Sequence, residues 1–198
     1  MQASDALVLV LAAGRGQRLG GAAKALLTLR SGETYLERIW ATATAAGIAR
    51  GAVVVGPPHG AQVAACARRL GLVVLDNPRP ELGMASSIEH GFTWAATTGA
   101  SGALLWPCDH PKVAPATITA LLSAASAEAG AVPEVDGRGG HPALVARALF
   151  GELTRCQHLP EGARTVLRAA KLARIPVADP GCVLDIDLPG DAARAEAS

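Results

Sequence analysis

Short apolar runs alternate with longer amphipathic stretches over most of the chain. Residues 6–11 are apolar at every position, which is typical of a strand buried on both faces of a parallel sheet. Residues 34–46 instead place Leu36, Ile39 and Ala43 on one face of a predicted helix. Ser86 and Glu89 have the spacing of a capping box, so Ser86 is expected to cap a helix and Glu89 to reach back to it.

The same reasoning, applied along the chain, gives a complete set of elements. Strands are predicted at residues 6–11, 52–55, 72–75, 103–106, 131–135, 142–145 and 173–177. Helices are predicted at residues 34–46, 59–70, 86–96, 115–127, 148–154 and 162–170, with a short terminal helix after residue 186.

This alternation predicts one three-layer α/β domain over residues 1–198, Rossmann-like, with a mostly parallel sheet covered on both faces. The chain shows no internal repeat and no linker. Ligands of such sheets bind at the carboxyl ends of the strands, so the loops after the first, third and fourth strands are the places to look for chemistry.

Composition narrows the function classes. The chain has 198 residues with 18 Lys+Arg against 17 Asp+Glu, and only 3% of its residues are aromatic. Neither a basic field nor a base-stacking surface is expected, so we predict no nucleic-acid partner. The four cysteines lie far apart in sequence, and no apolar stretch is long enough to span a membrane. We therefore expect reduced thiols, no membrane association and a cytoplasmic location.

The loop after the first strand, residues 14–24, contains four glycines together with Arg15, Arg18 and Lys24. Glycines expose backbone N–H groups to phosphate oxygens, and the cations offset phosphate charge. The spacing matches neither the dinucleotide fingerprint nor the P-loop. From these residues alone, a phosphate-binding loop and an arginine-rich surface loop both remain open.

The segment after the fourth predicted strand, residues 107–111, reads Pro-Cys-Asp-His-Pro. A carboxylate at that edge suits Mg²⁺, which binds a few carboxylates together with water and substrate phosphates. Asp109 could equally cap the next helix or form a turn before Pro111. Local sequence leaves both interpretations open.

Several motifs occur in a fixed order over nearly the whole chain. They are LAAGxGxRxGxxxK at 11–24, Asn77, GMASSI at 83–88, DHP at 109–111, GHP at 140–142, GAR at 162–164 and DIDxP at 185–189. Together they resemble the MobA-like nucleotidyltransferases, and within that family the molybdenum cofactor cytidylyltransferase branch. The resemblance implies a fold of the nucleotide-diphospho-sugar transferase type.

The resemblance also implies an activity. It implies Mg²⁺-dependent transfer of NMP from an NTP to a phosphate-bearing acceptor, molybdopterin, with release of pyrophosphate and delivery of the product to a molybdoenzyme. The opening Ala12-Ala13-Gly14, in place of Ala-Gly-Gly, favours CTP over GTP as the donor. Since a dissociated acceptor phosphate is already nucleophilic, the reaction needs positioning and charge stabilisation and no general base.

Carried over residue by residue, the resemblance gives the following site. The implied catalytic residues are Arg18, Lys24 and Asp109. The implied nucleotide-binding residues are Leu11, Ala12, Ala13, Gly14, Arg15, Gly16, Lys24, Asn77, Gly83 and Ser86. His141 and Arg164 are expected on the acceptor side, although a structural histidine and an ordinary ion pair with Glu161 explain them as well.

The metal ligands implied are Asp109 and Asp187. Asp185 and Asp187 alternate along an extended segment and face one side, so which of them reaches the metal stays open. Leu188 stands where the family usually has Thr.

Two other functions remain under consideration. One keeps the chemistry and replaces the acceptor with a sugar-1-phosphate or another small phosphate. The other is a non-catalytic carrier of molybdenum cofactor, which would consume no NTP.

Overall fold

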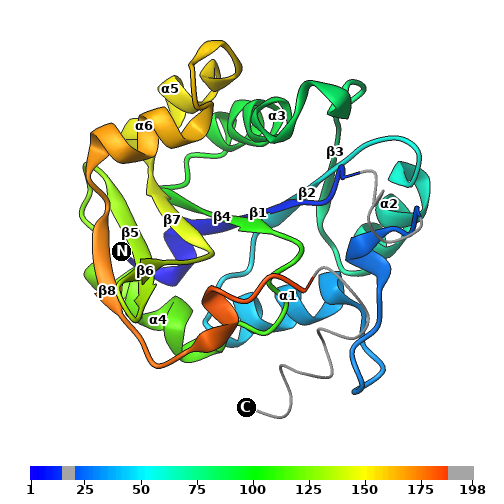
Figure 1. Cartoon of the computed structure of the whole chain (residues 1–198), viewed down its shortest axis with the longest axis horizontal. Helices are drawn as coiled ribbons and strands as arrows, with labels where there is room; N and C mark the ends of the chain where they lie inside the picture. The colour runs from blue at the N-terminus through cyan, green and yellow to red at the C-terminus, as the bar shows by residue number, and fades with distance from the viewer. Residues whose placement is uncertain (15–20, 187–198) are drawn as a thin grey trace.

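The computed structural model describes residues 1–14 and 21–186 (Figure 1). Its described strands form one sheet in the order β3-β2-β1-β4-β7-β5-β6, with β8 paired to β5. The strands are β1 (Ala6–Leu11), β2 (Gly51–Val55), β3 (Val73–Asp76), β4 (Gly102–Pro107), β5 (Gly130–Val135), β6 (Arg138–Gly139), β7 (Ala143–Ala146) and β8 (Ala173–Pro176). Neighbouring strands from β3 to β4 are parallel, whereas β7 is antiparallel to β4 and β5. The predicted mostly parallel sheet is confirmed.

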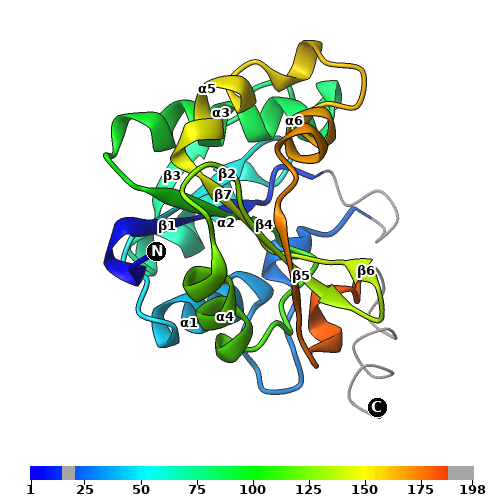
Figure 2. The same cartoon turned by 90° about the vertical axis from the view of Figure 1, so that its left-hand side faces the viewer.

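Helices cover both faces of this sheet (Figures 1 and 2). They are α1 (Tyr35–Ala45), α2 (Gly60–Arg69), α3 (Met84–Thr97), α4 (Pro115–Ala124), α5 (Phe150–Leu153) and α6 (Ala163–Ala170). The first, second and fourth lie on one face, and the other three lie on the opposite face (Figure 1). The three-layer α/β arrangement is therefore as predicted. No helix in the described part of the chain is long and apolar enough to cross a membrane.

Two apolar cores, one on each face, explain why β1 carries no polar residue. Val8 and Val10 pack in the core under α1, α2 and α4, whereas Leu7 and Leu9 pack in the core under α3 and α5. Each of these four side chains has 0% of its surface exposed. A strand covered on both faces gains from apolar side chains at every position, so its sequence runs without alternation.

The predicted capping box at Ser86 and Glu89 is wrong. Helix α3 begins earlier, at Met84, with Gly83 as its N-cap at φ +91°, a conformation that glycine adopts at low cost. The Ser86 hydroxyl donates to the Gly83 carbonyl oxygen, and Glu89 accepts a hydrogen bond from the backbone N–H of Gln157. The Ser86 side chain thus bonds back to the N-cap carbonyl and the Glu89 side chain makes a tertiary contact, so neither forms the predicted cap.

The hairpin of β5 and β6 was not predicted. Its two-residue turn is Asp136-Gly137, with φ +49° and φ +74°. Positive φ at both positions is the geometry for which Asp-Gly is favoured in two-residue hairpin turns, so the dipeptide was the signal. Helix α4 ends at Ala124, shorter than the predicted 115–127, and the predicted terminal helix lies outside the described residues.

A capping box does occur at the start of α1. The backbone N–H of Glu37 donates to the Thr34 hydroxyl oxygen at 3.2 Å, and the Thr34 N–H and hydroxyl donate to the Glu37 carboxylate at 2.7 and 2.8 Å. These two bonds from Thr34 lower the pKa of Glu37.

We predict that Thr34→Ala lowers the free energy of unfolding by about 1 kcal/mol at neutral pH, measured by urea denaturation. The loss should shrink as the pH falls through the lowered pKa of Glu37, because protonation removes the same interaction from the wild type. Thr44→Ala, near the exposed end of the same helix, is the control and should change stability by less than about 0.5 kcal/mol. Equal losses in the two variants would contradict a capping role.

Candidate functional site

The parallel strands bring distant parts of the chain to one edge of the sheet. Since β1, β2, β3 and β4 point the same way, the loops after them emerge at that edge. The antiparallel β7 begins there, which brings His141 to the loop after β4. Lys24 and Asp109, which are 85 residues apart in sequence, meet at this edge with a Nζ–Oδ2 distance of 3.4 Å.

Asp109 lies half-buried at the exit of β4, and its two oxygens have different surroundings. The Oδ2 atom faces Lys24. The Oδ1 atom is buried and has no hydrogen-bond partner among the described residues. A buried carboxylate oxygen without a partner is costly, and binding of a cation would remove that cost. Asp109 therefore fits the role of a metal ligand.

His110, the next residue, was part of a quoted motif but had no predicted role. Its Nε2 atom lies 3.0 Å from Asp185 Oδ1 and 3.7 Å from Asp109 Oδ1. Its ring centroid is 4.7 Å from that of His141. The sequence signals were the DHP motif and its place shortly after a buried strand, and the partner of His110 became evident only from the fold.

Residues 182–186, which we call the strap, lie across this edge. The Ile186 N–H donates to the Asp109 carbonyl oxygen at 3.0 Å, and the His141 N–H donates to the Cys182 carbonyl oxygen at 2.7 Å. A Cβ atom added to Gly140 would stand 2.5 Å from that Cys182 oxygen. Glycine before His141 is thus required for the close approach of the strap.

His141 lies in the same cluster, and its pKa is lowered to about 4. Desolvation by burial is the largest cause, followed by the nearby His110, while Asp109 acts in the opposite direction and Arg164 adds to the lowering. At neutral pH the imidazole is therefore uncharged. Burial also raises the pKa of Cys108 to about 12, so this thiol is unsuited to nucleophilic chemistry.

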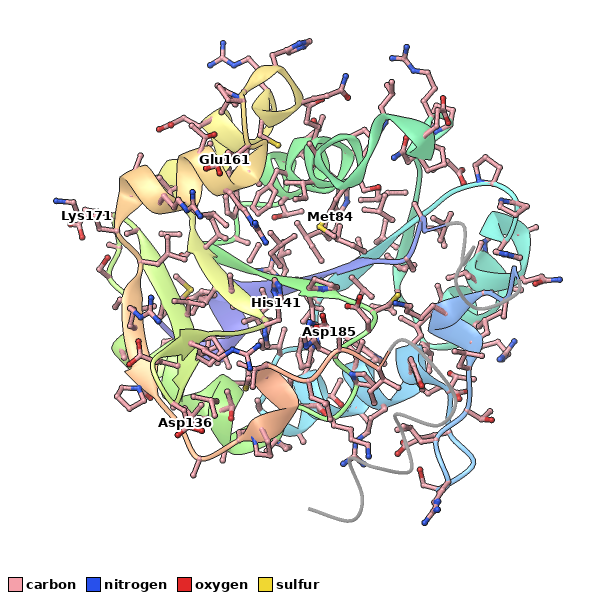
Figure 3. All side chains as sticks on the ribbon, in the orientation of Figure 1. Met84, Asp136, His141, Glu161, Lys171 and Asp185 are labelled. Atoms are coloured by element: carbon pink, nitrogen blue, oxygen red, sulfur yellow. The ribbon has the colours of Figure 1, made fainter. Side chains whose placement is uncertain are left out.

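Asn77, in the loop before α3, contacts Ser86, in the first turn of that helix, and each has less than 4% of its surface exposed. The Asn77 amide donates to the hydroxyl oxygens of Ser86 and Ser87, and its oxygen accepts from the Arg79 N–H. These polar groups thus hold the loop together. Met84, at the first turn of α3, is instead 60% exposed (Figure 3).

The remaining predicted residues divide by location. Leu11, Ala12 and Ala13 are buried at the end of β1, whereas Gly14 and Arg164 are exposed. Arg15, Gly16, Arg18 and Asp187 lie outside the described residues, so their predicted roles stay predictions.

The edge of the sheet offers a divalent metal ion few protein ligands. Within residues 1–14 and 21–186, no group of three or more His, Cys, Asp or Glu side chains could hold a metal ion. Mg²⁺ binds through one or two carboxylates and takes its remaining ligands from water and substrate phosphates. Asp109 could supply such a carboxylate.

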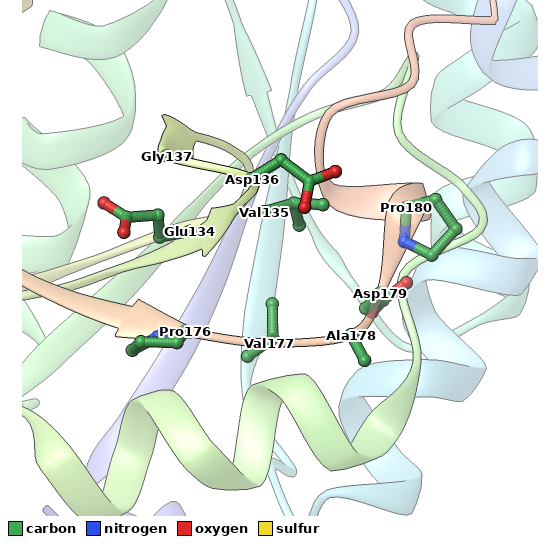
Figure 4. Close-up of a pocket in the computed structure, with 9 residues that line it drawn as sticks. All are labelled: Glu134, Val135, Asp136, Gly137, Pro176, Val177, Ala178, Asp179 and Pro180. Atoms are coloured by element: carbon green, nitrogen blue, oxygen red, sulfur yellow. The ribbon is translucent and has the colours of Figure 1, made fainter.

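A separate pocket of about 710 Å³ opens between the β5–β6 hairpin and the segment after β8 (Figure 4). Glu134, Asp136 and Asp179 line it, and Glu134 is paired with Arg174. The Asp179 carboxylate accepts hydrogen bonds from the Ala114 N–H and the Thr117 hydroxyl. An acidic lining repels a triphosphate, so we do not assign the nucleotide to this pocket.

Comparison with known proteins identifies the family. A family model described as the MobA-like NTP transferase domain matches residues 8–175. The chain belongs to this family. It is also 35% identical over 198 residues to a molybdenum cofactor guanylyltransferase of Cereibacter sphaeroides, covering 95% of this chain and 94% of that protein. The predicted MobA-like resemblance is confirmed, whereas the cytidylyl branch is not.

Solved structures agree with this assignment. Rv0371c from Mycobacterium tuberculosis matches with a TM-score of 0.78 and 29% identity over 100% of both chains. A structure of Rv0371c in complex with manganese matches with a TM-score of 0.74 and 26% identity over 98% of both chains. At 16% identity, 4-diphosphocytidyl-2C-methyl-D-erythritol synthase shares the fold, with a TM-score of 0.68 over 97% of this chain and 96% of that one. The fold is therefore of the nucleotide-diphospho-sugar transferase type.

The His141 environment gives a prediction about pH. Because its pKa in the folded state lies below the unfolded value near 6.5, the unfolded chain binds more protons there, and stability falls as the pH drops from about 6.5 to 4. NMR titration of the histidine ring protons should show His141 still mostly unprotonated at pH 5. Arg164→Gln should raise its pKa, because a nearby positive charge is removed. A His141 titration near pH 6.5 in the wild type would contradict the burial argument.

Proposed function

We propose that this protein transfers a nucleoside monophosphate from an NTP to the phosphate of molybdopterin and releases pyrophosphate. The observation that carries the proposal is the Lys24–Asp109 pair at the carboxyl edge, where the buried Asp109 Oδ1 atom has no hydrogen-bond partner among the described residues. This arrangement provides a cation for phosphate and an anion for a metal in the same place. Membership of the MobA-like NTP transferase domain family supports the reaction class.

The acceptor is proposed from the relatives. Full-length similarity to a protein named molybdenum cofactor guanylyltransferase supports a molybdopterin acceptor over a sugar-1-phosphate. A second chain, a molybdoenzyme that takes up the product, is part of the same proposal. Solvent-exposed Arg164 and Met84 and the neutral His141 are the groups proposed to face the acceptor.

In the proposed reaction, an oxygen of the acceptor phosphate attacks the α-phosphorus of the NTP, and the bond from that phosphorus to the β-phosphate oxygen breaks. Mg²⁺, when bound, would offset the negative charge that develops on the leaving pyrophosphate. Asp109 would hold the metal, and Lys24 would contact the phosphates. Arg15 and Arg18 are proposed to do the same from the glycine-rich loop.

No residue has to remove a proton from the nucleophile, because the acceptor phosphate is already ionised at neutral pH. His141 is uncharged there, so it would contribute a hydrogen bond and no charge. The chain's contribution is thus to position two phosphates and to compensate their charge.

For the donor we propose CTP. Ala13 is 4% exposed at the end of β1, and its methyl group stands 3.2 Å from where a Cβ on Gly56 would lie. Replacing Ala13 with glycine would remove one methyl group and free its volume, which would suit a larger base. The name guanylyltransferase carried by the Cereibacter protein supports GTP instead, so the donor has to be measured.

Thermal unfolding with each of CTP, GTP, ATP and UTP, with and without Mg²⁺, tests nucleotide binding. At a hundredfold excess over Kd, the proposed donor should stabilise the wild type by about 2.7 kcal/mol. Asp109→Asn should lose the Mg²⁺-dependent part of the shift, because it removes the negative charge that the metal requires. Asp136→Asn, in the acidic pocket, is the control and should behave as wild type.

If no nucleotide raises the unfolding temperature of the wild type, the transferase proposal fails and a non-catalytic cofactor carrier takes its place. If Asp109→Asn keeps the full Mg²⁺-dependent shift, the metal ligand has been assigned to the wrong residue.

Ala13→Gly tests the donor base. We expect the preference for CTP over GTP, measured as the ratio of dissociation constants, to fall by about tenfold when this methyl group is removed. An unchanged ratio would mean that the end of β1 does not read the base. Ala6→Gly, at the opposite end of β1 and likewise buried, is the matched control and should leave the ratio at that of the wild type.

A further inference from the structure

His110 is one of the most deeply buried polar residues of the site, with 3% of its surface exposed. Its backbone is fixed by the core, because the indole N–H of the fully buried Trp106 donates to the His110 carbonyl oxygen at 2.9 Å. The His110 N–H donates to the Pro107 carbonyl oxygen. The imidazole therefore extends from a rigid turn at the end of β4.

The Nε2 atom of this ring faces two carboxylates. Asp185 Oδ1 is at 3.0 Å and Asp109 Oδ1 at 3.7 Å, so the shorter contact is to the strap. His141 packs against the ring at a centroid distance of 4.7 Å. The backbone bond from Ile186 to Asp109 fixes the strap next to the same contact.

Stability does not explain this arrangement well. The Asp185 side chain is 64% exposed, so water competes for its carboxylate and the contact adds little to the free energy of folding. The contact does fix the orientation of the Asp185 side chain, because an exposed aspartate on an irregular segment would otherwise sample several rotamers. Both the Asp185 carboxylate and Asp109 Oδ1 face the Nε2 atom of His110, so His110 holds the Asp185 carboxylate close to that of Asp109.

We infer that His110 is a positioning residue, which holds Asp185 beside Asp109 so that both carboxylates serve one divalent cation. This inference rests on the proposed function. It assigns Asp185 to the metal site, a question that the sequence left open between Asp185 and Asp187. Groups that orient metal-binding side chains typically change metal affinity by 10- to 100-fold when they are removed.

Two amide variants separate positioning from packing. His110→Gln places an amide nitrogen near the position of Nε2, whereas the shorter His110→Asn cannot reach Asp185. Both keep a polar group of moderate size in the same buried place. Mn²⁺ binding in the presence of CTP, and separately of GTP, is measured from the loss of the free-ion signal in electron paramagnetic resonance. No acceptor is added, so no turnover is needed for the readout.

We expect His110→Asn to weaken Mn²⁺ binding by about tenfold or more, and His110→Gln to stay within about twofold of the wild type. Asp185→Asn should weaken binding to a similar extent as His110→Asn. The double variant should be no weaker than either single variant, because both changes break the same contact. Arg168→Gln, in α6, breaks an exposed ion pair with Glu161. It is the control and should bind Mn²⁺ as the wild type does.

Wild-type affinity in His110→Asn would overturn the inference, and so would losses that multiply in the double variant. If His110→Asn fails to fold, the other two variants still test the inference. Wild-type Mn²⁺ affinity in Asp185→Asn would contradict it, and so would a tenfold loss of Mn²⁺ affinity in His110→Gln. Absence of any nucleotide-dependent Mn²⁺ binding in the wild type would instead overturn the proposed function itself.

Discussion

The half-buried carboxylate of Asp109 requires a compensating positive charge, and much of the site is arranged around that need. Pairing of β1 with β4 in the middle of the sheet places the exits of these strands side by side. Lys24 then reaches Asp109 from the loop after β1, although it lies 85 residues away in sequence. His110 and the strap approach from the other side. A metal and a triphosphate would meet a site whose charges are already in place.

Most of the fold was predictable because burial controls it. The run of apolar residues in β1 follows from two cores on opposite faces, and that signal is present in the sequence itself. The false capping box arose where a local pattern competes with other contacts of the same side chains. Ser86 and Glu89 have capping-box spacing, yet Ser86 bonds to Gly83 and Asn77 and Glu89 bonds to Gln157, far away in sequence. Local rules cannot weigh a contact whose partner is unknown.

The site was predictable to the extent that it lies on strand exits. Lys24 and Asp109 were both named from the sequence, and the structure brings them into contact. The contact between His110 and Asp185 was not predictable, because it depends on how the strap returns across the sheet edge. The base of the donor nucleotide is harder still to predict from the sequence. It depends on differences as small as the Ala13 methyl group, and motifs shared by a whole family do not resolve such differences.

In the proposed reaction, a phosphate of molybdopterin becomes bonded to a nucleotide at the edge of the sheet that carries Asp109. The most direct test incubates the wild-type protein with molybdopterin, Mg²⁺ and each NTP, and identifies the product by mass spectrometry while pyrophosphate is counted. We expect molybdopterin extended by CMP, with one pyrophosphate released per product. Extension by GMP would confirm the reaction and correct the donor. Recovery of unmodified molybdopterin and NTP would contradict the proposed transfer.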